Sequence, residues 1–298
     1  MRRAFPYTGR LDLRLTLKDL GLWGGTSWMR VDSDGAWYAR RTPDGPGTVR
    51  IWQESEAVVA EAWGPGAAAV LDRVPDLCGL HDDPSTWTPT HPILAELKRR
   101  RPGWRIGRTG HVYPRLVSTV LGQLVTGKAG KQSLNRVARA WGEPAPGPDV
   151  GLWLLPVPKV LAAQPYYAFH RMGIERMRAD RVRRVASRAS ALERAVRMSA
   201  PDAMAHLQKL PGIGPWTAGV VAALALGDPD AVPVGDYNLP SVVSWTLANE
   251  PRADDVRMLE LLAPEAGNRG RAVRLIKTGG RGKVKFGPKV DVPDFRGM

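Results

Sequence analysis

The spacing of apolar residues changes once along the chain, and this change limits the fold to a sheet region followed by a helical region. From residue 10 to about residue 63 the apolar positions alternate, as at Leu11, Leu13 and Leu15. After His91 they recur at intervals of three and four residues. Alternation is typical of strands and the longer interval of helices, so the sequence predicts an α+β fold.

The first region is predicted to be an antiparallel β-rich lobe, residues 1–90. Asp34-Gly35 and Asp44-Gly45 mark hairpin turns, because glycine accepts the positive φ that tight hairpins require. A helix is expected within residues 64–80. The predicted strands lie at 10–17, 27–31, 35–41, 48–54 and 57–63.

The second region, residues 91–280, is predicted to be a mostly α-helical domain, and residues 281–298 a basic, mobile tail. The apolar spacing predicts helices at 91–101, 113–125, 130–142, 175–198, 201–210, 216–227, 239–249 and 253–263.

The charge balance favours a polyanionic partner. The chain has 43 Lys and Arg against 29 Asp and Glu, a net charge of +14. Two basic clusters stand out: residues 98–108, and residues 269–289, where no acid occurs. We interpret both clusters as contacts to a phosphate backbone.

The single cysteine, Cys78, excludes a disulfide framework, a cysteine zinc site and a four-cysteine iron–sulfur cluster. The first residues lack the apolar region of a signal peptide, and no run approaches the roughly 20 apolar residues of a membrane span. We expect a monomeric cytoplasmic protein, associated with the nucleoid and not with membranes.

The segment Leu-Pro-Gly-Ile-Gly-Pro-Trp-Thr-Ala, residues 210–218, lies between two predicted helices. Gly212 and Gly214 permit a turn that a Cβ would block, and they leave backbone N–H groups uncovered beside a helix N-terminus, where an anion is favoured. Ile213 is expected to point inward and hold the two helices together. The alternative is an ordinary helix–turn–helix connection.

Asp236 follows this turn in the sequence Val-Pro-Val-Gly-Asp-Tyr. An Asp just before the predicted helix 239–249 is well placed to cap its N-terminus. A functional carboxylate is the other reading. The two roles are compatible, because a cap holds the carboxylate still.

Residues 210–218 followed by residues 232–237 resemble the hairpin and acidic loop of the helix-hairpin-helix DNA glycosylase superfamily, and in particular its AlkA-type 3-methyladenine DNA glycosylases. A second match is Val-Leu-Gly-Gln-Leu-Val, residues 120–125. The resemblance covers roughly residues 91–278 and the sheet lobe only in outline.

The resemblance implies hydrolysis of the N-glycosidic bond of alkylated bases in duplex DNA, which initiates base excision repair without a cofactor. Asp236 would be the catalytic residue, stabilising the cationic sugar or orienting water. Trp216, Tyr237 and Gln123 would line the base pocket. Bifunctional members carry a lysine where Trp216 stands, so the resemblance implies no lyase activity; Trp216 as a core aromatic is the alternative.

The same resemblance implies which residues bind DNA. Leu124 would be the wedge that fills the gap left by the extruded base, with a helix-core role as its alternative, and Lys128 would contact phosphate or remain solvated. It leaves open a monovalent ion at the backbone carbonyls of Gln208, Leu210 and Ile213, and implies no other metal. The hairpin contacts would come from Pro211, Gly212, Ile213, Gly214 and Thr217.

Some positions depart from the family pattern. Residues 263–269 contain no aromatic residue, Val220 lacks the ring that some AlkA-type enzymes have, and Asn238 replaces a familiar histidine. These departures leave the preferred lesion open. Two other function classes also stay open: a non-catalytic lesion-sensing protein on the same fold and a structural RNA-binding protein.

Overall fold

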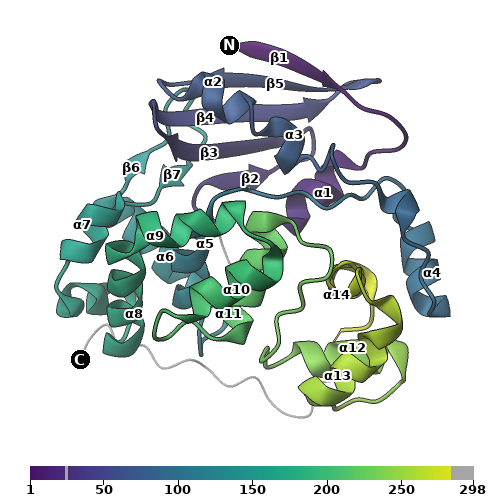
Figure 1. The fold of residues 1–298 in the computed structure, drawn as a ribbon. Helices are drawn as coiled ribbons and strands as arrows, with labels where there is room; N and C mark the ends of the chain where they lie inside the picture. The colour runs from purple at the N-terminus through teal and green to yellow at the C-terminus, as the bar shows by residue number, and fades with distance from the viewer. Residues whose placement is uncertain (24–25, 283–298) are drawn as a thin grey trace.

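The computed structural model describes residues 1–23 and 26–282, so residues 283–298 of the predicted basic tail lie outside the described residues. A five-stranded antiparallel sheet stands at one end of the molecule, above two groups of helices (Figure 1). Its strands, in spatial order, are β1 (Arg2–Pro6), β5 (Ala57–Trp63), β4 (Gly45–Gln53), β3 (Ala36–Thr42) and β2 (Met29–Val31). The prediction of an antiparallel sheet is confirmed.

Both predicted hairpin turns are present. Thr42 pairs with Gly45 across the β3–β4 turn, and Val31 pairs with Ala36 at the β2–β3 turn. Gly35 has a φ of +154°, and a Cβ there would lie 2.3 Å from the Ile51 carbonyl oxygen. The turn therefore requires glycine at this position, as the sequence predicted.

The prediction of a strand at residues 10–17 is wrong: residues Leu13–Asp19 form helix α1. The Asp12 side chain accepts a hydrogen bond from Leu15 N, a helix N-cap that the alternation concealed. Leu13, Thr16 and Leu17 are buried on one helix face. The alternating leucines are compatible with a strand and with a helix, and the N-cap at Asp12 favours the helix.

The first helical group packs under the sheet and shares its core. Sheet residues such as Val49 and Ile51 belong to the same buried cluster as Leu116 and Val117 of α5. The domain boundary that we place at residue 90 stays a prediction. The elements of this group are α2 (Ala67–Leu71), α3 (Val74–Leu77), α5 (Val112–Leu121), α6 (Gly127–Trp141), α7 (Pro158–Ala163), α8 (Arg176–Ser187), α9 (Ala189–Glu193), α10 (Ala200–Gln208) and α11 (Pro215–Val221).

Shorter elements complete this part of the chain. Helix α11 continues directly into a π-helical turn, η4 (Ala222–Leu226), which ends at Gly227 with a φ of +74°. The others are η2 (Tyr166–Met172), η3 (Arg194–Arg197) and the strand pair β6 (Glu143–Pro144) and β7 (Trp153–Leu154).

The second helical group has a separate buried cluster, which includes Leu94, Val243 and Ile276. In Figure 1 its C-terminal helices lie beside the hairpin helices α10 and α11. The loop from Gly227 to Asn238 carries the chain from the first group to the second, so Asp236 lies at their junction. The elements are η1 (Pro84–Thr86), α4 (Pro92–Arg99), α12 (Leu239–Leu247), α13 (Asp255–Leu262), η5 (Ala263–Glu265) and α14 (Arg269–Gly279).

Helix α14 corrects the interpretation of the C-terminal basic cluster. Residues 269–279 were not predicted to be helical, and their arginines pair with acids inside the protein. Arg274 and Asp19 form an ion pair at 3.0 Å in which both side chains are fully buried. The other two pairs are Arg269 with Asp230 and Arg271 with Asp82. Arg271 and Arg274 are buried and are not available to phosphates, whereas Arg269 is partly exposed beside Asp230.

The basic cluster at residues 98–108 also makes ion pairs within the protein, although Arg99 and Arg100 stay exposed and share one carboxylate. Arg99 and Arg100 pair with Glu96, and Arg108 pairs with Asp76. Their charges are thus partly neutralised where we expected phosphate contacts.

Candidate active site

The turn between α10 and α11 is built by two glycines with different roles. Gly212 has a φ of +96°, and a Cβ there would lie 2.7 Å from Arg181 Cγ. Gly214 has a φ of −95°, and a Cβ there would meet nothing within 4 Å. The prediction that a Cβ is blocked at both positions is therefore wrong for Gly214. Its missing side chain leaves the backbone at the start of α11 open to an approaching group.

Neighbouring side chains fasten this turn to the first helical group. Ile213 points into the core, as predicted, and is 4% exposed. Arg184 of α8 donates a hydrogen bond of 2.8 Å to the Pro211 carbonyl oxygen. The hairpin is therefore fixed by the packing of Ile213 in the core and by the hydrogen bond from Arg184.

Gln123, directly after α5, connects three elements. Its Nε2 donates to the Gly212 carbonyl oxygen at 3.2 Å and to Thr217 Oγ1 at 2.9 Å. Its Oε1 accepts from Arg181 Nη1 at 2.7 Å. Gln123 thus positions the hairpin, and Thr217, expected to contact DNA, is buried beneath it at 1% exposure.

The next residue, Leu124, stands out from the surface. Its side chain is 84% exposed and its φ is +58°, a conformation that costs energy for any residue with a Cβ. A helix-core role does not fit this exposure. The unfavourable backbone and the apolar exposure of Leu124 are what the predicted wedge role requires.

Lys128 is exposed in the first turn of α6, close in sequence to Leu124. This turn contains no acid, and a cation is unfavourable at a helix N-terminus. An anion bound there would be stabilised both by the uncovered N–H groups and by Lys128.

Asp236 is fixed by three donated hydrogen bonds. Trp216 Nε1 donates to Oδ2 at 3.0 Å, and Asn238 N and Leu239 N donate to Oδ1 at 2.9 and 3.0 Å. One oxygen of Asp236 therefore covers the start of α12, as the capping interpretation predicts, and the other contacts Trp216, the tryptophan of α11. The carboxylate is half-buried.

The loop that carries Asp236 is also anchored. Gly235, with a φ of +91°, donates its N–H to both carboxylate oxygens of Asp255 at 3.1 Å. Its Cα lies against Trp216, since a Cβ there would be 3.7 Å from Trp216 Cβ. Tyr237, on the other side of Asp236, is 87% exposed. The loop thus orients Asp236 toward α11 and Tyr237 outward.

Lys277 of α14 is a neighbour of Asp236 that the sequence analysis did not identify. Its Nζ lies 4.8 Å from the centroid of the Trp23 ring. Desolvation lowers the pKa of Lys277, and the nearby Asp236 carboxylate opposes this shift. Only the fold brings a residue of α14 to Asp236, so sequence spacing gave no signal of it.

Of the three carbonyls expected to hold a monovalent ion, that of Leu210 accepts a hydrogen bond from Ile213 N at 3.0 Å. Within residues 1–23 and 26–282, no group of three or more His, Cys, Asp or Glu side chains is placed to hold a metal ion. No helix in that part of the chain is long and apolar enough to cross a membrane.

Comparison of sequences finds relatives that carry the expected activity in their names, whereas no protein-family model matches the chain. The chain is 31% identical to DNA-3-methyladenine glycosylase 2 of Escherichia coli over 178 residues, covering 58% of this chain and 61% of the relative. Across the curated relatives that it matches, the chain spans between 30% and 61% of their length.

Comparison of structures identifies the fold over nearly the whole chain. The 3-methyladenine DNA glycosylase of Archaeoglobus fulgidus has a TM-score of 0.76 at 18% identity, covering 92% of this chain and 97% of that one. MBOgg1, solved in complex with a low-affinity DNA ligand, has a TM-score of 0.73 at 18% identity, covering 92% and 93%. This chain therefore has the fold of the helix-hairpin-helix DNA glycosylases and is related in sequence to their AlkA-type members.

Proposed function

We propose that the chain is a monofunctional DNA glycosylase that hydrolyses the N-glycosidic bond of alkylated, 3-methyladenine-like bases in duplex DNA and so initiates base excision repair. The observation that carries this proposal is the fixed carboxylate of Asp236, which lies between Trp216 and the start of α12. The name of the Escherichia coli relative, DNA-3-methyladenine glycosylase 2, supports the substrate class. We also propose that the protein works in the cytoplasm on nucleoid DNA.

The reaction that we propose follows from charge. As the base leaves, positive charge develops on the sugar, and a carboxylate held by fixed donors stabilises it without reorganising. At a separation of about 4 Å and an effective dielectric of about 20, the attraction is about 4 kcal/mol, roughly a thousandfold in rate. Water then attacks the sugar, and Asp236 is placed to orient it.

The DNA contacts that we propose surround this carboxylate. The open backbone at Gly214 and the exposed start of α6 with Lys128 would bind phosphates, and Leu124 would enter the duplex where the base has been extruded. Trp216 donates a hydrogen bond to Asp236, and Tyr237 follows Asp236 in the sequence. We propose that the rings of Trp216 and Tyr237 line the base pocket. Gln123 supports the hairpin from behind.

Replacing Asp236 by Asn tests the catalytic role. We expect excision of methylated bases from alkylated duplex DNA to fall about a thousandfold, while DNA affinity is unchanged or slightly higher because a negative charge is lost. The measurements are single-turnover base release and fluorescence anisotropy with the same duplex.

A control is needed because Asp236→Asn can place its side-chain NH2 group opposite the Trp216 N–H. Two hydrogen-bond donors would then face each other and could displace the Trp216 ring. Trp216→Phe keeps a ring and removes this donor, so it should retain much more activity than Asp236→Asn. Equal losses in the two variants would assign the effect to the displaced ring. Wild-type protein that binds the duplex but releases no base would favour the non-catalytic lesion-sensing alternative.

The proposed lack of lyase activity has its own test, because Lys277 places an amine near Asp236. A lyase forms a Schiff base with the sugar, which borohydride reduces to a permanent protein–DNA crosslink. We expect no crosslink with abasic duplex DNA. A crosslink that disappears in Lys277→Met would show instead that the enzyme is bifunctional.

A further inference from the structure

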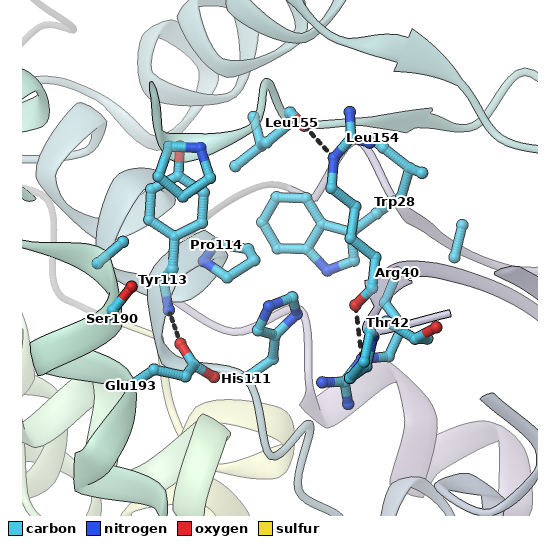
Figure 2. A pocket seen from close by; sticks show the side chains of 15 residues that line it. Trp28, Arg40, Thr42, His111, Tyr113, Pro114, Leu154, Leu155, Ser190 and Glu193 are labelled. Atoms are coloured by element: carbon cyan, nitrogen blue, oxygen red, sulfur yellow. Dashed lines mark hydrogen bonds between the residues drawn. The ribbon is translucent and has the colours of Figure 1, made fainter. Parts of the chain in front are cut away.

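A cavity of about 360 Å³ lies between strand β3, the start of α5 and helix α9 (Figure 2). It is lined at the N-terminal end of α5, by His111 and Tyr113, whereas Gln123 follows the C-terminal end of the same ten-residue helix. At 1.5 Å per residue the two ends are about 15 Å apart. Neither Asp236 nor the hairpin lines the cavity, so it is separate from the proposed DNA site.

Most of the cavity wall is apolar and rigid. Figure 2 shows the rings of Trp28, Tyr113 and Pro114 around one space. Leu154 and Leu155 of the β7 region also line it. Because aromatic and proline rings change shape little, this wall suits a flat apolar body, and the volume is at the lower end of the range of about 300 to 1,000 Å³ for small-molecule sites.

One cation in the wall has no ionic partner. Within the described residues Arg40 forms no ion pair, and its hydrogen bonds, to the carbonyl oxygens of Thr109 and Arg41, are both long at 3.4 Å. Glu193 also lines the cavity, but its two oxygens accept the N–H groups of Val112 and Tyr113 at 3.0 and 2.9 Å. Glu193 attracts the Arg40 guanidinium through space but forms no ion pair with it, and Arg40 Nη2 makes no hydrogen bond to a described residue, so this nitrogen is left for another group.

His111 lies beside this guanidinium and is neutral. Desolvation holds the pKa of His111 well below its usual value, and the Arg40 and Arg73 charges lower it further. Its ring makes no hydrogen bond to a described residue and lines the cavity. The imidazole therefore offers a second hydrogen-bonding group next to Arg40.

We propose that this cavity binds a small aromatic carboxylic acid of one or two rings, with the carboxylate on the Arg40 guanidinium and His111 and the ring against Trp28. A cationic ligand would be repelled by Arg40. A neutral ligand would remove water from the Arg40 guanidinium without supplying an anion in its place, and this loss of hydration is unfavourable. The inference goes beyond the proposed function and does not depend on it.

The experiment uses three probes of one shape on the full chain without DNA: 1-naphthoate, 1-naphthalenemethanol and 1-naphthylmethylamine, measured by isothermal titration calorimetry. We expect 1-naphthoate to bind at least tenfold more tightly than either other probe. Arg40→Met should weaken naphthoate binding at least tenfold, whereas the control Arg50→Met, on β4 and not lining the cavity, should leave it unchanged.

Ser190→Trp is a second variant, because Ser190 is an exposed lining residue whose enlargement fills the cavity without disturbing the core. It should abolish naphthoate binding while circular dichroism stays that of the wild type. Equal affinity for the three probes, no naphthoate binding up to its solubility limit, or full binding by either cavity variant would overturn the proposal. Asp236→Asn should bind naphthoate like wild type, which separates this result from any failure of the glycosylase proposal.

Discussion

We call the surface made by the turn at residues 210–214, Leu124 and Lys128 the hairpin face. The hairpin face and helix α14 both have sequence features that suggest DNA binding, yet their side chains are arranged in opposite ways. In α14 Arg271 and Arg274 are turned inward, and Arg274 is fully buried against Asp19. On the hairpin face the unusual residues are turned outward: Leu124 is 84% exposed with a φ of +58°, and Lys128 is exposed at a helix start. Clustered charge in a sequence therefore does not by itself indicate a binding surface, and we place the proposed DNA contacts where the exposed residues lie.

The strongest test of this contrast is Arg274→Met. It leaves Asp19 buried without its partner, which should lower the free energy of unfolding by about 3 to 5 kcal/mol, measured by urea denaturation. The fraction that remains folded should bind duplex DNA as tightly as wild type.

The matched control is Asp19→Leu combined with Arg274→Met, which removes both charges and should recover most of the stability. If Arg274→Met alone had wild-type stability and weakened DNA binding, α14 would belong to the DNA interface. The contrast between α14 and the hairpin face would then be wrong.

The two hairpin glycines give the next largest effects, in different measurements. Gly212→Ala should destabilise the protein by about 1 to 3 kcal/mol, because its φ is +96° and the new Cβ would meet Arg181. Gly214→Ala should change stability by less than about 0.5 kcal/mol, since its backbone and surroundings accept a Cβ.

For the folded protein, DNA affinity should be affected more by Gly214→Ala than by Gly212→Ala. A methyl group at Gly214 stands between the backbone and a phosphate, so we expect binding to weaken about tenfold, or about 1.4 kcal/mol. Unchanged affinity in Gly214→Ala would remove the start of α11 from the proposed interface.

Lys128→Ala should have the smallest effect. Loss of one phosphate contact should reduce the slope of log affinity against log salt by about 0.9, with no loss of stability. Arg2→Ala, on the edge strand β1, removes an equal charge far from the hairpin and should leave the slope unchanged (Figure 1). Equal slopes in both variants would mean that net charge alone attracts DNA.

The local features of this molecule could be predicted from the sequence, and its long-range pairings could not. The positive φ of Gly212, the inward Ile213 and the hydrogen bonds that Asp236 accepts at the start of α12 follow from rules that act over a few residues. Helix α1 was missed because alternating leucines fit both periods. Helix α14 was missed because its buried arginines hide the apolar stripe that identifies a helix.

The candidate site shows the same limit. Asp236 and Trp216 could be linked by motif spacing, but the approach of Lys277 depends on how the second helical group packs. Likewise Gln123 was expected in the base pocket, and only the structure shows its amide bonded to Gly212 and Thr217. Side-chain partners that lie dozens of residues apart are chosen by tertiary packing, which no local pattern encodes.

The buried pair of Asp19 and Arg274 has a consequence for how the protein is made. The partners are 255 positions apart in the chain, so at about 5 to 20 residues per second Asp19 waits on the order of 10 to 50 s for its arginine during translation. Until then the Asp19 carboxylate has no partner, so it must stay hydrated and its burial has to wait for α14. The pairing of α1 with α14 is thus a late event in the synthesis of the chain, after nearly all of the other helices have been made.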